Sequence, residues 1–150
     1  MSIVNPSPAW KLMKAALVAT NQTIATATWT KCQLSVELID DDAAFNPATY
    51  RYVVPVTGRY LVIAGIIFSD LTDQTDFELR LINQASTVTY LFIMSRMSGA
   101  GWVGLQTLNI VTFTAGEDVH LEVYQASGAN RTLRGDQPTW TFLTIYRVLP

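Results

Sequence analysis

The chain has 150 residues, a length that fits one domain with a hydrophobic core of its own. Charged residues make up only 15% of the sequence, whereas apolar residues reach 49% and the mean hydropathy is +0.22; an average soluble domain carries about 25% charged residues. The net charge of −2, with basic residues spread thinly, excludes the clustered Lys and Arg that nucleic-acid binding requires. A surface so poor in charge predicts an obligate oligomer that hides apolar patches.

The sequence lacks the features of a disulfide-bonded, secreted or membrane-spanning protein. Cys32 is the only cysteine, so no intrachain disulfide forms, and we expect a buried, inert thiol. The apolar run 15–19, which follows Lys11 and Lys14, is too short for a signal peptide or a membrane span. We therefore expect a protein that is not secreted by a signal peptide and has no membrane partner.

The first fourteen residues differ from the rest of the chain. A Ser-Pro pair suits the start of a short helix on which Trp10, Met13 and Leu17 would share one face. An extended arm fits the same residues equally well. In both interpretations Trp10 and Met13 lie outside the domain that follows. We predict that residues 1–14 form an arm that anchors the chain to a neighbouring protein, with a tail folded over its own domain as the alternative.

From residue 15 onward the apolar residues alternate with a period of two, and turn residues recur at short intervals. This pattern is typical of an antiparallel sandwich or barrel, and no long helix is expected. The turns coincide with Gly, Pro, Asn and Asp, which tolerate or set turn geometry. The predicted strands are 15–20, 24–30, 32–39, 50–56, 59–68, 76–82, 87–96, 102–113, 118–125 and 139–148.

Two of these strands are apolar on both faces. The strand 59–68 places Leu61, Ile63 and Ile67 on one side and an equally apolar set on the other, and the strand 87–96 is similar. An antiparallel sheet with one face in water alternates apolar with polar residues instead. The outer face of one sheet must therefore be covered, most simply by another copy of the chain.

Four segments carry a family resemblance. The segment 41–60 contains a turn, an aromatic strand, Pro-Val and Gly-Arg-Tyr; 77–83 is a strand that ends at an Asn; 108–119 is an apolar strand followed by Gly-Glu-Asp-Val; and 139–146 is an aromatic closing strand. In this order and spacing they resemble the globular domain of the complement C1q/tumour necrosis factor superfamily. The resemblance implies an all-β, ten-stranded antiparallel jelly-roll sandwich over residues 15–150 that assembles as a tight trimer.

The same resemblance selects residues for the trimer interface. On the strand 59–68 it selects Leu61 and Ile63, and on the final strand it selects Trp140 and Phe142. Leu143 and Ile145 then face the core. The interface implied by the resemblance is therefore made of large apolar side chains.

The residue types that catalysis or metal binding would use are interpreted as structural. His120 is the sole histidine, and Glu122 could orient it as a general base, but we interpret His120 as a half-exposed strand residue. The aspartates of 40–42 and 70–76 lack the spacing of a calcium loop, so they are interpreted as solvated turns. The adhesion-like tripeptide Arg-Gly-Asp at 134–136 is interpreted as an ordinary turn. We predict no enzymatic activity, no metal and no cofactor.

Similar trimeric jelly rolls occur in bacteriophage virions, as capsid decoration proteins and as tail-fibre or spike tips. A Thr- and Gln-rich chain without a leader fits that setting better than an extracellular animal protein. The sequence thus predicts a homotrimeric virion structural protein that reinforces a phage capsid, with itself and the major capsid protein or other virion proteins as partners, assembled in the host cytoplasm. The alternative is a receptor- or glycan-binding tip of a tail fibre or spike, whose long shaft this sequence lacks.

Overall fold

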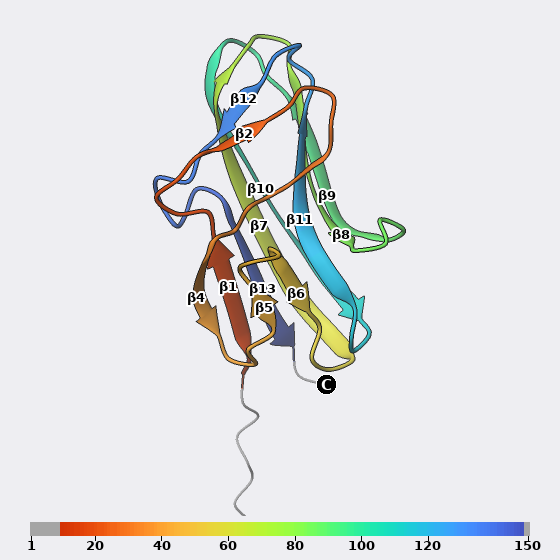
Figure 1. Cartoon of the computed structure of the whole chain (residues 1–150). Helices are drawn as coiled ribbons and strands as arrows, with labels where there is room; N and C mark the ends of the chain where they lie inside the picture. Colours follow the sequence, from red (N-terminus) through yellow and green to blue (C-terminus); the bar gives the residue numbers. More distant parts are fainter. Residues whose placement is uncertain (1–9, 149–150) are drawn as a thin grey trace, which may run out of the picture.

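Residues 10–148 are described by a computed structural model, in which they form two antiparallel sheets packed face to face (Figure 1). No helix among these residues is long and apolar enough to cross a membrane. The strands are β1 (Leu12–Ala16), β2 (Gln22–Ile24), β3 (Thr30–Lys31), β4 (Val36–Asp40), β5 (Phe45–Asn46), β6 (Arg51–Val53), β7 (Gly58–Leu71), β8 (Asp76–Asn83), β9 (Thr89–Arg96), β10 (Gly101–Phe113), β11 (Asp118–Gln125), β12 (Arg131–Leu133) and β13 (Phe142–Val148).

Long strand β7 organises the first sheet. This sheet runs β2-β12-β7-β13-β1-β4, and β10 pairs with β7 along the side that β12 and β13 leave free. The second sheet runs β5-β6-β11-β8-β9, with β3 also paired to β11. Within the described residues, β10 and β9 are therefore edge strands, one in each sheet.

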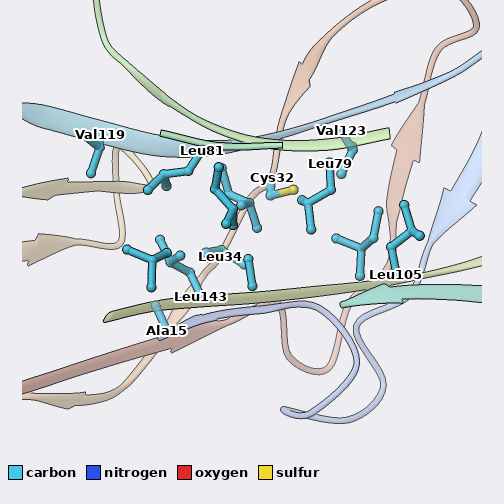
Figure 2. Packing of buried hydrophobic residues seen from close by; sticks show 14 of the residues in the cluster. Ala15, Cys32, Leu34, Leu79, Leu81, Leu105, Val119, Val123 and Leu143 are labelled. Carbon is cyan, nitrogen blue, oxygen red and sulfur yellow. The ribbon is translucent and has the colours of Figure 1, made fainter. Parts of the chain in front are cut away.

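The hydrophobic core lies between the two sheets, where alternate side chains of each strand point inward. Figure 2 shows the second sheet contributing Leu79 and Val123 from one side and the first sheet contributing Leu143 from the other. Cys32 and Leu34, in the chain after β3, fill the space between them. Burial raises the pKa of the Cys32 thiol well above its usual value, so the prediction of a buried, inert thiol is confirmed in its burial.

The predicted antiparallel sandwich is confirmed, and the strands from residue 50 onward lie close to their predicted positions. The earlier part of the chain differs from the prediction. The predicted strand 24–30 is a loop that joins the ends of two short strands, because residues 25–29 form no strand ladder and only the Ala27 N–H donates to β11, at the carbonyl of Gln125. Short strand β12 lies just after a loop tip and has only three residues, too few to show a periodicity.

The predicted boundary between an arm and the domain is wrong. Strand β1 begins at Leu12 and is hydrogen-bonded between β13 and β4, so the domain starts before residue 15. Met13 is 1% exposed and belongs to the core rather than to an anchoring arm. The physical reason is that Met13, Ala15 and Leu17 are spaced by two residues, and all three point inward from extended chain. Residues 1–9 lie outside the described residues.

We expect Met13→Ala to lower the free energy of unfolding by about 2–5 kcal/mol, because it removes a fully buried side chain and leaves a cavity between the sheets. Val88→Ala, at a side chain that is 43% exposed, is the control and should cost less than about 1 kcal/mol. Denaturant unfolding followed by circular dichroism measures both. A Met13→Ala protein as stable as the control would restore the arm interpretation.

Candidate self-association face

The outer face of the first sheet is apolar at its centre. On β7, Tyr60, Val62 and Ile66 are buried in the core, whereas Leu61 and Ile63 point the other way and remain half-buried. This is the two-sided pattern that the sequence predicted. A sheet face exposed to water would carry polar side chains at the outward positions.

The register of the strands extends this face across the sheet. Ile110, Leu61 and Tyr146 lie in one row from β10 through β7 to β13, and Leu108 and Ile63 begin the next row. Side chains in such rows on one face are close enough to pack together. Together with Ile67 and Phe142, these residues form what we call the apolar face (Leu61, Ile63, Ile67, Leu108, Ile110, Phe142 and Tyr146).

Phe142 lies on this face because the sequence provides space for its ring. Its register partner on β7 is Gly65, and a Cβ atom at Gly65 would lie 2.5 Å from the Phe142 ring. Only a residue without a side chain leaves room for the ring to lie flat on the strand. The outward orientation of Leu61, Ile63 and Phe142 and the inward orientation of Leu143 and Ile145 agree with the predicted pattern. Whether the outward residues contact a partner chain stays a prediction.

Trp140 does not lie on the final strand, contrary to the prediction. That strand begins at Phe142, and Trp140 sits in the preceding turn, with its ring edge-on to Trp102 at a centroid distance of 5.5 Å. The Arg134 guanidinium lies over the Trp102 ring at 4.5 Å. Pro138 and the turn that follows it occupy the residues before Phe142, so the final strand begins two residues after Trp140. The predicted alternation, which started at Trp140, therefore began too early.

The two edge strands expose large apolar side chains. The sequence predicted two apolar faces for the strand 87–96, but it did not single out Leu108 and Ile110. Leu108 and Ile110 on β10 are 64% and 61% exposed, and Phe92 and Met94 on β9 are 49% and 57% exposed. A shallow groove of about 320 Å³ runs between these strands. An exposed, apolar edge strand can pair with a strand of another chain unless something covers it. The near absence of charge between residues 82 and 115 indicates an apolar surface in this part of the chain. Which side chains are exposed depends on the edge positions of β9 and β10, and these follow from the strand order.

Trp10 is the first described residue and lies at the margin of the apolar face. It is 56% exposed and stacks on Tyr146 with a centroid distance of 5.3 Å. Its predicted role in anchoring the chain to a lattice stays a prediction. The stacking shows that its ring packs beside this face of its own chain.

The aspartates and the Arg-Gly-Asp tripeptide serve the turns that contain them. Asp40 accepts a hydrogen bond from the backbone N–H of Phe45, and Asp76 pairs with Arg96. Gly135 packs so closely on the backbone carbonyl of Thr20 that a side chain there would overlap it, while the flanking Arg and Asp pair with each other. Among residues 10–148 no group of three possible metal ligands is found.

His120 is buried rather than half-exposed, which corrects the prediction. Its side chain is 4% exposed, and Nε2 lies 2.9 Å from the Glu122 carboxylate. Because a carboxylate only accepts, Nε2 carries the proton, and Nδ1 is left as a buried acceptor with no hydrogen-bond partner in the described residues. Arg80 holds the other Glu122 oxygen at 2.7 Å. Strands β6 and β3 pair with β11 just before and just after His120, an arrangement that sequence periodicity could not reveal.

Comparison with solved structures identifies the fold of the chain. No known protein family and no curated protein matches the sequence. Among solved structures, a tumour necrosis factor, Eiger, from S. frugiperda is 13% identical with a TM-score of 0.71 over 93% of both chains. Murine APRIL is 14% identical with a TM-score of 0.71, over 93% of this chain and 100% of that one. The globular domain of a zebrafish complement 1qA protein is 15% identical with a TM-score of 0.64, over 93% and 98%. The chain therefore has the C1q/tumour necrosis factor jelly-roll fold.

The buried His120 makes stability depend on pH. Burial lowers its pKa below the ordinary value near 6.5; the hydrogen bond to Glu122 opposes this, and the charges of Lys31 and Arg51 add to it. As pH falls through that value, the unfolded chain takes up a proton that the folded chain does not. Stability is therefore lost on acidification, by at most about 1.4 kcal/mol per pH unit. Glu122, whose pKa is lowered from 4.5, adds its own loss only at more acidic pH.

We expect His120→Gln to flatten the pH dependence of unfolding between about pH 7 and pH 5, because Gln carries no proton to take up. Denaturant unfolding at several pH values measures the slope for the variant and the native protein, with the mass of the assembly recorded in each sample. Equal slopes for the two proteins would contradict the assignment of the effect to His120.

Proposed function

We propose that the protein is a homotrimeric structural or attachment module, held together by the apolar face and the exposed edge formed by β9 and β10. The observation that carries the proposal is the exposure of large apolar side chains on the outer face of β10 and on neighbouring β9, above all Leu108 and Ile110. Exposed apolar patches of this kind mark protein interfaces. The number three comes from the resemblance to C1q/tumour necrosis factor domains, whose fold this chain shares.

Two different apolar surfaces suit a closed ring. Rotational assemblies with more than two subunits join unlike patches, so that each subunit offers both. Here the patches are the apolar face around Leu61 and Ile63 and the edge that carries Phe92 and Met94. In the proposed trimer the edge of one subunit packs on the apolar face of the next. The edge strands are then covered, which removes the site for unwanted strand pairing.

The proposed setting is a virion, with capsid decoration as the leading role and the tip of a tail fibre or spike as the alternative. A low proportion of charge and a composition rich in Thr and Gln support this setting. In this proposal the assembly partners are other copies of the chain and the major capsid protein or other virion proteins. The protein acts by binding, so no catalytic step is assigned to it.

We expect Leu108→Asp to convert the trimer into a folded monomer. Leu108 is 64% exposed, so an aspartate there leaves the core of the subunit intact. In the trimer, each subunit would lose about 1.5–3 kcal/mol of apolar burial and would also bury a carboxylate without a partner. Ile63→Asp, on the predicted partner surface, should have the same effect. Light scattering gives the mass, and circular dichroism gives the fold.

Val56→Asp is the matched control, because Val56 is 47% exposed, lies in the loop between β6 and β7 and is not one of the residues that form the apolar face. It should leave the mass unchanged. Trimers of normal stability for both Leu108→Asp and Ile63→Asp would refute this interface.

A further inference from the structure

A polar groove of about 420 Å³ lies on the flank of the sandwich, away from the apolar face. It forms where β2 and β3 approach the turn between β5 and β6. Its lining is hydroxyl, amide and cationic side chains, and it includes no carboxylate. The lining residues are Gln22, Thr30, Lys31, Gln33, Ala48, Thr49, Tyr50 and Arg51.

Lys31 and Arg51 bring two positive charges to this groove. Two acids lie behind it: Asp118 Oδ2 pairs with Arg51 at 3.3 Å and Glu122 Oε2 pairs with Arg80 at 2.7 Å, whereas Asp118 Oδ1 has no hydrogen-bond partner within the described residues. Among residues 10–148, no carboxylate lies within ion-pair distance of Lys31. The two carboxylates pair with Arg51 and Arg80. Lys31 is therefore the cation left without a counter-charge.

The environment of the groove penalises these two positive charges. Burial and the positive charge of Arg51 lower the pKa of Lys31, with Asp118 and Glu122 opposing the change. The Nε atom of Arg51 is buried and makes no hydrogen bond within the described residues. A negative group in the groove would relieve the repulsion between Lys31 and Arg51, because opposite charges in a partly desolvated site attract strongly.

The groove is fixed by hydrogen bonds of its own walls. The Gln22 amide donates to the carbonyl of Lys31 at 2.8 Å and accepts from the N–H of Gln33 at 2.9 Å, so both sides of Cys32 are held in place. On the opposite wall Tyr50 adopts a left-handed backbone conformation, with φ of 58°. It is the last residue of the turn that leads into β6, whose first residue is Arg51. A pre-formed site of this kind loses little entropy when it binds a ligand.

We propose that this groove binds the oxyanion group of a small polar ligand, such as the carboxylate or sulfate of an acidic sugar. Lys31 and Arg51 hold the oxyanion through charge-assisted hydrogen bonds. The hydroxyl of Thr49 and the amide of Gln33 line the groove for the polar remainder of the ligand, and the Thr30 hydroxyl, which donates to the carbonyl of Thr28, can accept from it. This site goes beyond the proposed assembly role, because none of its residues belongs to the apolar face or to the β9–β10 edge.

The test is a nuclear magnetic resonance titration of the native protein with sodium glucuronate, sodium sulfate and glucose at constant ionic strength. We expect saturable shifts of the Lys31 and Arg51 signals with glucuronate or sulfate and none with glucose. Stronger binding of glucuronate than of sulfate indicates that the oxyanion is recognised on a sugar, and the reverse order indicates the free ion. Lys31→Gln should weaken binding at least about tenfold, the effect of losing one charge-assisted hydrogen bond.

Arg59→Gln removes the same charge from an exposed residue of β7 and should change the affinity less than about twofold. Lys31→Arg restores the charge and should restore most of the binding. The mass of each variant is measured in the same samples, so a failure of assembly is distinguished from a failure of the groove. Three outcomes overturn the proposal: no saturable binding of either anion, equal binding by Lys31→Gln, or equal binding of glucose.

Discussion

Strand β7 is apolar on both of its faces, and much of the architecture follows from that pattern. Its inner side chains, such as Tyr60 and Phe68, make the centre of the core. Its outer side chains, Leu61 and Ile63, are equally apolar, yet residues 10–148 supply no third layer over them. Neighbouring strands reinforce the outer face, since β10 adds Leu108 and β13 adds aromatic rings. Apolar surface of this extent is stable only when something covers it.

The other sheet carries a network of interacting polar side chains. Arg80 binds Glu122 and stacks on Trp29 at 3.9 Å, and Glu122 in turn holds His120. This separation gives the two sheets different roles. The first sheet offers non-directional apolar area, which suits assembly, whereas the flank of the second offers directional charges, which suit recognition of a small ligand. The two proposals therefore concern different surfaces and are tested separately.

Alternation of apolar residues was enough to predict the long strands and to place Leu61 and Ile63 on one face, because a period of two is visible over seven or more residues. The outward direction of Phe142 was predicted from the family resemblance. Alternation failed where strands are short, and it failed at Met13, where a helical spacing to Trp10 and Leu17 competed with the true alternation. Edge position depends on strand order, so the exposure of Leu108 and Met94 could not be predicted. The groove joins Lys31 to Arg51 across different strands, which the sequence gives no way to anticipate. An identity of 13–15% to solved structures of the same fold agrees with this, since the alternation pattern and not the residue identities carries the fold.

The central claim, that the apolar surfaces on both sides of β10 are covered by other copies of the chain, is tested most directly by the mass of the unmodified protein. Sedimentation equilibrium at micromolar concentration and moderate salt measures this mass without a fusion partner. The account predicts one species at three times the chain mass of 16.6 kDa. A soluble species of 16.6 kDa that remains monomeric as its concentration is raised would contradict it.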